Sequence, residues 1–456
     1  MSLSGVPPPN DNIESKDEKY YDPEGDALKP DLTQPVDDPF GNEANAEIKY
    51  KTLKWWQCGF FMIAESVSLG VLSLPSTLEA IGLAPSVVII VGLGVIATYT
   101  GYTIAQFRAA HPHIHNLADA GEILMGPFGR ELFGLGQILF SIFIMGSHIL
   151  TFRDMMNTVT EHGTCSIVFS IVGLVICLVL SLPRTIKNLT YVSFASFVSI
   201  LSAVIITMIG VAVQAKPDRT VEITTETNLY HAFKGVTEIV FAYCAHVAFF
   251  GLLAEMEKPE DFPKAVVMLQ GFEVALYVTA SVVIYYYVGN GVASPAFGSA
   301  GPVLKKVAYG IAIPTIVGAG VVNGHVGLKY IYVRIFRHTD KMHKRDWVGL
   351  GSWLAIGLGC WIIAWIISEA IPTFNDLLSL ISSLFASWFS FGLGGIYWLH
   401  LNWGKYFSSP SKFILAIINA LIAGIGATIC GLGLYVSGKA IHDHAGGSAF
   451  TCANTV

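Results

Sequence analysis

The sequence predicts an all-α integral membrane protein with about eleven transmembrane helices. Of its 456 residues, 53% are hydrophobic and only 13% are charged, and the mean hydropathy is +0.57. An ordinary soluble chain carries about 25% charged residues. The composition therefore argues against a soluble enzyme, a disordered scaffold and a nucleic-acid binder. The expected surroundings are a lipid bilayer.

Residues 1–47 are predicted to form a disordered cytoplasmic tail. The first 50 residues contain twelve acidic residues and four lysines. A segment this acidic, rich in proline and without apolar periodicity, cannot bury enough surface to fold alone. One hypothesis is that the tail meets trafficking or ubiquitination machinery through Lys16, Lys19 or Lys29.

Residues 48–436 are predicted to form the membrane domain. A hydrocarbon core about 30 Å thick requires roughly 20 helical residues, and clusters of charge or turn residues bound eleven apolar windows near this size. The windows are 56–81, 86–107, 132–156, 167–182, 190–214, 234–254, 265–289, 303–333, 348–370, 375–400 and 412–436. The fourth is short and the eighth is long, which packing or tilt can accommodate.

The loop charges predict the orientation of these spans. With the N-terminus inside, the cytoplasmic loops carry thirteen lysines and arginines and the opposite segments carry six. Positive residues favour the cytoplasmic side. We therefore predict a cytoplasmic N-terminus and, after eleven spans, an extracellular C-terminal tail at residues 437–456. The expected membrane is the plasma membrane, with the vacuolar membrane as the alternative.

The first window is predicted to be a broken helix. Gly70 and Pro75 lie near its middle, among small residues. Proline removes a backbone hydrogen bond, and glycine lowers the cost of leaving helical angles. We expect unwinding around 68–73, with a simple proline kink as the alternative. Unwound backbone at bilayer depth must be buried in protein or line a wet cavity, and it can bind a carboxylate or an ammonium group.

The sixth window also carries polar groups at its middle, between Gly235 and Gly251. It begins five spans after the first and from the opposite side. Two inverted five-span units with one extra span would produce this pairing. The two halves share no residue identity that supports the repeat. With no phosphate-binding loop to split a nucleotide, such a bundle has the profile of a secondary transporter driven by an ion gradient.

Three short elements stand out in the sequence. The first is Gly70-Val71-Leu72-Ser73-Leu74-Pro75 in the first window. The second runs from Phe241-Ala242-Tyr243 through His246 and continues at Glu255-Met256-Glu257-Lys258-Pro259-Glu260-Asp261-Phe262. The third is Asn323-Gly324-His325, followed by Lys329-Tyr330-Ile331-Tyr332-Val333-Arg334. Together they resemble the amino acid/auxin permease (transmembrane amino acid transporter) family over roughly residues 48–436, and filamentous-fungal neutral amino acid permeases within it.

This resemblance implies a leucine-transporter-like fold with broken helices 1 and 6, and proton-coupled uptake of amino acids by alternating access. It also implies that Val67 to Ser73 hold the carboxylate and amine of the substrate, with Tyr243 and His246 facing it. The full predicted substrate-binding set is Glu65, Ser66, Val67, Ser68, Gly70, Ser73, Phe241, Tyr243 and His246. Apart from Glu65, the predicted pocket lacks a fixed charge that could pair with a charged side chain, so neutral aliphatic and aromatic amino acids are the expected substrates.

Two residues are candidates for proton coupling. Glu65 lies about ten residues into the first window, where an ionisable side chain is costly and is a functional candidate by default. It would carry the proton or pair with the substrate ammonium; the alternative is a carboxyl neutralised by nearby hydroxyls. His246 titrates in the range of a proton relay, or is a satisfied histidine of the bundle.

Four further residues are gating candidates. Arg153 and Asp154 lie on the outer half of the third window, and as neighbours in a helix they are not expected to face each other. They form a gate or pair with another span. Asn323 and Lys329 lie on the inner half of the eighth window, where Lys329 either takes part in gating or snorkels to the surface. No metal site is expected: His111, His113 and His115 lack a second ligand cluster.

Cys165 and Cys452 are predicted to form a disulfide. Both fall on the predicted outer side, which is oxidising at a cell surface. The other five cysteines lie inside spans, where cysteine packs as a small apolar side chain.

The expected function is therefore proton-driven symport of neutral amino acids without a cofactor. Sodium in place of the proton is one alternative, because backbone carbonyls near Ala64 and Val67 could coordinate it. A non-transporting amino-acid sensor of the same fold is the other.

Overall fold

A computed structural model describes residues 51–183, 186–336, 347–444 and 449–453. Within these ranges the chain is helical, and the one β-bridge joins Leu53 to Met256. The predicted tail at 1–47, with its three candidate lysines, lies outside the described residues.

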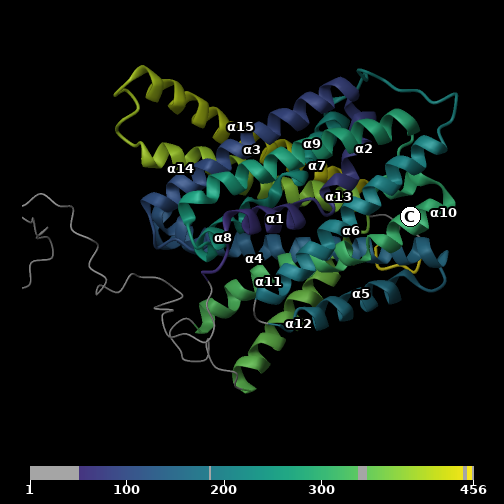
Figure 1. Cartoon of the computed structure of the whole chain (residues 1–456), viewed down its shortest axis with the longest axis horizontal. Helices are drawn as coiled ribbons and strands as arrows, with labels where there is room; N and C mark the ends of the chain where they lie inside the picture. The colour runs from purple at the N-terminus through teal and green to yellow at the C-terminus, as the bar shows by residue number, and fades with distance from the viewer. Residues whose placement is uncertain (1–50, 184–185, 337–346, 445–448, 454–456) are drawn as a thin grey trace, which may run out of the picture.

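The helices form a bundle whose long axis lies horizontally in Figure 1. In chain order they are α1 (Trp55–Ser66), α2 (Gly70–Ile81), α3 (Leu83–Ala110), α4 (Leu117–Thr160), α5 (Ser166–Leu180), α6 (Ile186–Val213), α7 (Leu229–Ala242), η2 (Cys244–Ala248), α8 (Phe249–Glu255), η3 (Pro259–Asp261), α9 (Phe262–Val288), η4 (Ala296–Ala300), α10 (Pro302–Ile311), α11 (Ile313–Phe336), α12 (Trp347–Ala370), α13 (Phe374–Ile381), η6 (Ser382–Gly392, a π-helix), α14 (Leu393–Leu401) and α15 (Pro410–His444).

The predicted fold class is confirmed. Nine helical stretches of the described residues are long and apolar enough to cross a membrane, and the bent pair α1–α2 adds a tenth. The window at 167–182 falls on α5, an apolar helix of only 15 residues. The number of eleven spans and the inverted five-plus-five repeat therefore stay predictions.

Two helices extend beyond their predicted windows. The third window begins at 132, whereas α4 starts at Leu117, because Asn116 caps it by accepting from the Asp119 backbone N–H at 3.0 Å. The non-helical Gly126 (φ 65°) before Pro127 divides α4 at a kink into two helical segments, and the predicted window lies in the second.

At the other end of the chain, α15 continues past the predicted limit at 436 to His444. Ser437 and Ala440 are fully buried there, and the Lys439 ammonium lies 4.9 Å from the centre of the Tyr230 ring. Packing against α7 thus extends the helix into the predicted tail.

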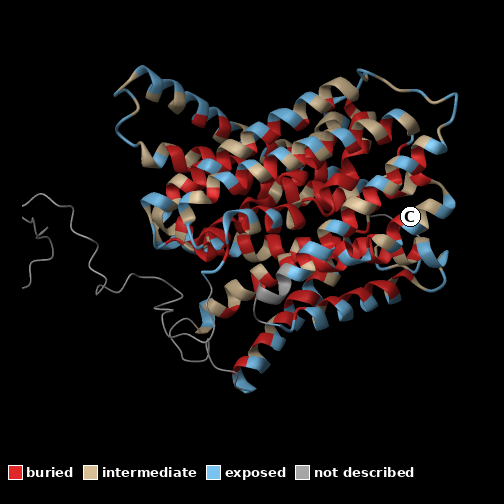
Figure 2. Cartoon of the chain, in the orientation of Figure 1, coloured by how far each residue is buried: buried red, intermediate tan, exposed pale blue. Residues whose placement is uncertain are grey.

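Burial separates central from peripheral helices (Figure 2). Residues 229–255 hold α7, η2 and α8, and 83% of their most apolar stretch is buried. The most apolar stretch of residues 374–401 is buried to the same extent. In α15 the share is only 22%. The side chains that α15 and α12 expose are large and apolar, as expected where lipid replaces water. The broken helices therefore lie at the centre of the bundle.

The two ends of the bundle differ. We call the end where α1 begins and α8 ends the tail end, and the opposite end, where α4 meets α5, the disulfide end (Figure 1). There Cys165 and Cys452 are joined by a disulfide that spans 287 residues of sequence. The backbone beside it is held too, because the Phe450 N–H donates to the Glu369 carbonyl at 3.3 Å and the Ser166 hydroxyl donates to the Ala453 carbonyl at 2.8 Å.

Removing this crosslink is expected to lower stability. A disulfide typically contributes about 2–4 kcal/mol, and more when it closes a long loop. We expect Cys165→Ser/Cys452→Ser to unfold at a lower temperature than the wild type in thermal denaturation of the detergent-purified protein. Cys430→Ser, at a free half-buried thiol, is the control. Equal unfolding temperatures for the double variant and the wild type would contradict the crosslink.

Candidate functional site

The first span is broken as predicted, but at a different place. Helix α1 ends at Ser66 and α2 begins at Gly70, with a 56° bend between them. The break is therefore 67–69 rather than 68–73. Pro75 lies inside α2, so it does not mark the point where the helix ends. Gly70 permits a close approach of the two broken spans, because a Cβ there would lie 2.8 Å from the Cα of Ala242 in α7.

The sixth span is also interrupted. Helix α7 ends at Ala242, the 3₁₀-helix η2 follows, and α8 resumes at Phe249. The carbonyl of Ala242 accepts from the Tyr277 hydroxyl of α9 at 2.9 Å and from the Ser66 hydroxyl of α1 at 3.4 Å. Side chains thus satisfy a backbone group at the helix break, as buried irregular backbone requires.

A small cavity lies where the two breaks meet. Its volume of about 30 Å³ is room for about two water molecules, so the site is contracted in this conformation. Five predicted residues line it: Glu65, Ser66, Ser68, Phe241 and Asn323. The other lining residues are Leu69, Phe140, Ile144, His148, Cys244 and Ala245. We call this space the central cavity.

Glu65 is the acidic residue of the central cavity. Its Oε2 atom is buried and has no hydrogen-bond partner among the described residues. The carboxyl also lines a second cavity of about 10 Å³ toward the tail end. This oxygen is therefore an available hydrogen-bond acceptor at the wall of the central cavity.

Several predicted substrate contacts do not reach the central cavity. The Tyr243 hydroxyl donates to the Ile90 carbonyl of α3 at 2.9 Å, and His246 Nε2 lies 2.9 Å from the Ala97 carbonyl on the same helix. In this conformation both side chains contact α3 after the change to a 3₁₀-helix at Ala242, and that they face the substrate stays a prediction.

Val67 is buried in the break. Ser73 is helical, and its hydroxyl donates to the Gly70 carbonyl at 3.0 Å. Cys244 and Ala245 take the places expected for Tyr243 and His246 at the cavity wall.

A second buried carboxyl joins the two breaks. Glu273 of α9 is fully buried and accepts a hydrogen bond from the Ser66 hydroxyl, while Tyr277 lies 3.4 Å from the same Oε1 atom. One network thus connects α1, the end of α7 and α9. Sequence reasoning missed Glu273, although it lies in the apolar window 265–289 and the criterion that selected Glu65 also selects it.

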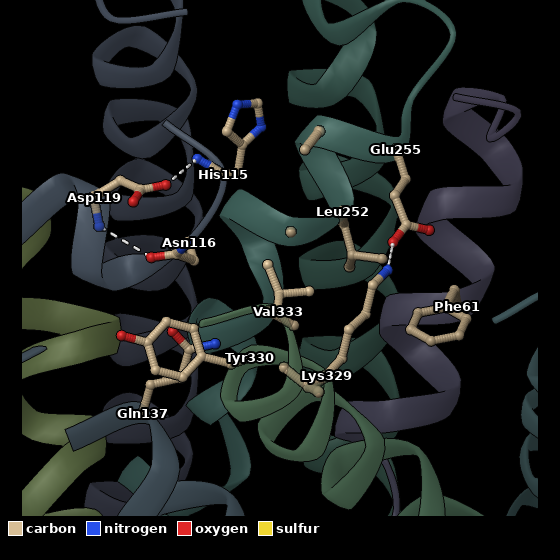
Figure 3. Close-up of a pocket in the computed structure, with 14 residues that line it drawn as sticks. Phe61, His115, Asn116, Asp119, Gln137, Leu252, Glu255, Lys329, Tyr330 and Val333 are labelled. Carbon is tan, nitrogen blue, oxygen red and sulfur yellow. Dashed lines mark hydrogen bonds and ion pairs between the residues drawn. The ribbon is translucent and has the colours of Figure 1, made fainter. Parts of the chain in front are cut away.

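A larger pocket opens at the tail end (Figure 3). We call it the vestibule, and its volume is about 140 Å³. Its lining residues are Phe61, His115, Asn116, Asp119, Gln137, Ala248, Gly251, Leu252, Ala254, Glu255, Val326, Lys329, Tyr330 and Val333. The 10 Å³ cavity shares Ala248 and Val326 with the vestibule, and Glu65 with the central cavity. The three spaces therefore follow one another from the helix breaks to the tail end.

The gating candidates at the disulfide end form a buried ion cluster. Arg153 Nη2 lies 3.1 Å from Asp154 Oδ1 and donates to the Pro372 carbonyl at 2.9 Å, and Nη1 lies 3.9 Å from Glu369 Oε2 of α12. The expectation that Arg153 and Asp154 do not face each other is wrong, because the long guanidinium side chain folds back along α4. The alternative, a charge pair with another span, is present as well.

Another ion pair closes the same end. Lys234 of α7 lies 2.7 Å from Asp376 of α13. Nearby, Glu238 is buried and accepts a hydrogen bond from Ser76 at 3.2 Å. These contacts join α2, α7 and α13 on the disulfide-end side of the central cavity.

The two tail-end gating candidates lie on the same route. The Asn323 side chain lines the central cavity and donates to the Ala319 carbonyl at 3.0 Å. Lys329 lines the vestibule, where its ammonium lies 2.8 Å from Glu255 Oε1. As for metal binding, the described residues contain no group of three or more His, Cys, Asp and Glu side chains that could hold an ion.

An all-helical membrane bundle in which two interrupted helices meet at a polar cavity has the architecture of a transporter. Residues 51–438 match the family described as transmembrane amino acid transporter protein. The chain belongs to this family, which consists of transporters and not enzymes, and the resemblance of the three sequence elements is confirmed.

Relatives in fungi and animals support the assignment. The chain is 35% identical to the N amino acid transport system protein of Neurospora crassa over 89% of this chain and 88% of that protein. It is 31% identical to a transmembrane transporter of Gibberella moniliformis over 85% and 83% of the two chains. A third relative, sodium-coupled neutral amino acid transporter 7 of Xenopus laevis, is 24% identical over 44% of this chain and 48% of its own.

Proposed function

We propose that this amino acid transporter is a proton-coupled symporter that imports neutral amino acids by alternating access. The observation that carries the proposal is the carboxyl of Glu65, whose buried Oε2 atom lacks a partner among the described residues beside the central cavity. Such a carboxyl can take a proton or the substrate ammonium on one side of the membrane and release it on the other. We keep His246 as a second candidate for the relay, acting from its place against α3.

The lining of the central cavity supports neutral substrates. Besides Glu65, the titratable side chains in the cavity wall are His148 and the thiol of Cys244. The Nδ1 atom of His148 already lies 2.7 Å from the Ile316 carbonyl. Phe140, Ile144 and Phe241 complete the wall with apolar surface. A charged substrate side chain would be desolvated there without a partner, at a large cost in free energy.

The conformation supports alternating access. The three linked cavities lead from the helix breaks toward the tail end, whereas buried ion pairs hold the disulfide end closed. With the tail end in the cytoplasm, as the loop charges predict, this is an inward-facing state. Opening the other end would require the Arg153 and Lys234 pairs to separate.

We place the chain in the plasma membrane, with the N-terminus in the cytoplasm and the C-terminus outside. The disulfide supports this orientation, because disulfides persist in oxidising compartments such as the cell surface. The vacuolar membrane is the alternative. A cytoplasmic N-terminus is also what the proposed role of the acidic tail in trafficking or ubiquitination requires.

Uptake of radiolabelled leucine into proteoliposomes tests the coupling ion. We expect accumulation with an acidic exterior and no sodium. Accumulation that requires sodium would favour the sodium-coupled alternative, for which the name of the Xenopus relative is the support. Saturable leucine binding without flux in either buffer would favour the sensor.

A further inference from the structure

We propose that the vestibule is a second amino acid binding site, which holds the substrate as a zwitterion between the central cavity and the tail end. The inference rests on the proposed function for its substrate class. Its site is separate, because Lys329 and Glu255 line the vestibule but not the central cavity.

The first argument is the charge pair in the wall. Lys329 of α11 and Glu255 at the end of α8 lie 2.8 Å apart, with their side chains 21% and 8% exposed (Figure 3). A ligand with a single charge that displaced one partner would separate this largely buried ion pair, which is strongly unfavourable. A zwitterion avoids this cost, since its carboxylate meets the Lys329 ammonium while its ammonium meets the Glu255 carboxylate.

The second argument is an unsatisfied acceptor. Gln137 of α4 lines the same pocket and is only 4% exposed, and its Oε1 atom is buried without a hydrogen-bond partner in the described part of the chain. Buried polar atoms are rarely left unpaired. A hydrogen-bond donor in the occupied pocket would satisfy this oxygen.

The third argument is the apolar wall around the ion pair. Figure 3 shows Phe61 on one side of the Lys329–Glu255 contact and Leu252 and Val333 on the other. A charged headgroup beside an apolar surface matches an amino acid with an apolar side chain. A pocket of about 140 Å³ is also larger than the contracted central cavity of about 30 Å³, so in this conformation the vestibule has more room for a ligand.

Equilibrium binding of radiolabelled leucine to the detergent-purified full chain, measured to millimolar concentrations, tests the proposal. We expect two leucines per chain in the wild type. Lys329→Met/Glu255→Leu removes both charges of this ion pair together, so it is expected to bind one. Gln137→Leu is expected to weaken leucine binding in the vestibule about tenfold, which corresponds to roughly 1.4 kcal/mol. Leucine binding in the central cavity should not change.

The matched control is Lys306→Met/Glu161→Leu, an exposed pair 2.5 Å apart at the disulfide end, which should keep two sites. One bound leucine in the wild type, or two in the Lys329/Glu255 double variant, would overturn the second site while leaving transport intact. Failure of the proposed function is detected by a different measurement: the wild type would show no proton-driven uptake in proteoliposomes, whether it binds one leucine or two.

Discussion

Glu65→Gln is expected to abolish proton-driven accumulation while leaving exchange of internal for external substrate. The glutamine side chain resembles the protonated carboxyl in shape, but it cannot release a proton. A gradient of one pH unit stores about 1.4 kcal/mol per proton, which supports about tenfold accumulation. We expect the wild type to approach this ratio if one proton accompanies each substrate, and the variant to stay near equal concentrations on the two sides.

Leucine accumulation in proteoliposomes under an imposed pH gradient measures this effect, and exchange of labelled for unlabelled leucine shows that the variant is folded. Glu122→Gln, at an exposed carboxyl of α4 paired with Arg130, is the control for loss of a charge. If Glu65→Gln accumulated leucine as the wild type does, Glu65 would be neither the proton carrier nor the required partner of the ammonium group.

The second large effect is expected at Arg153. Arg153→Met leaves two carboxyls, Asp154 and Glu369, buried without the guanidinium that lies 3.1 and 3.9 Å from them. Removing one partner of a buried ion cluster typically costs about 3–5 kcal/mol. We expect a clear fall in the temperature of thermal unfolding and a low yield of folded protein.

Removing the orphaned charges should restore stability. In Arg153→Met/Asp154→Asn/Glu369→Gln no charge is left unpaired in the cluster, so most of the unfolding temperature is expected to return. Arg130→Met, at an arginine whose side chain is 45% exposed, should change it little, because surface ion pairs contribute about 0–1 kcal/mol. Equal unfolding temperatures for the single and triple variants would contradict the electrostatic explanation.

Composition and helix breakers predicted most of the fold. The thickness of the bilayer sets the length of an apolar window that can span it. The fold class could therefore be predicted without knowledge of any contact between helices. The break in the first span was predicted from Gly70 and Pro75, but its position is set by the packing of α2 on Ala242, which is a contact between distant segments. The start of α4 at Leu117 and the extension of α15 to His444 likewise depend on a local cap and on packing.

The site could be predicted only in part. Glu65, Ser66 and Ser68 reach the central cavity because they lie at the break itself. Helical spacing gives no side-chain direction once the chain leaves the α-helix. The contacts of Tyr243 and His246 with α3 could therefore not be predicted from the sequence. The partners of the breaks, such as Glu273 and Phe140, come from α9 and α4, and no local pattern connects those helices to the first span.

The most direct test of the account is the proton movement that accompanies the substrate. Wild-type protein is reconstituted into sodium-free liposomes that contain a pH-sensitive dye, and leucine is added outside at equal internal and external pH. The account predicts acidification of the lumen that follows the leucine concentration, disappears with a protonophore and is absent in Glu65→Gln. Leucine entry with no change in luminal pH would contradict proton-coupled transport.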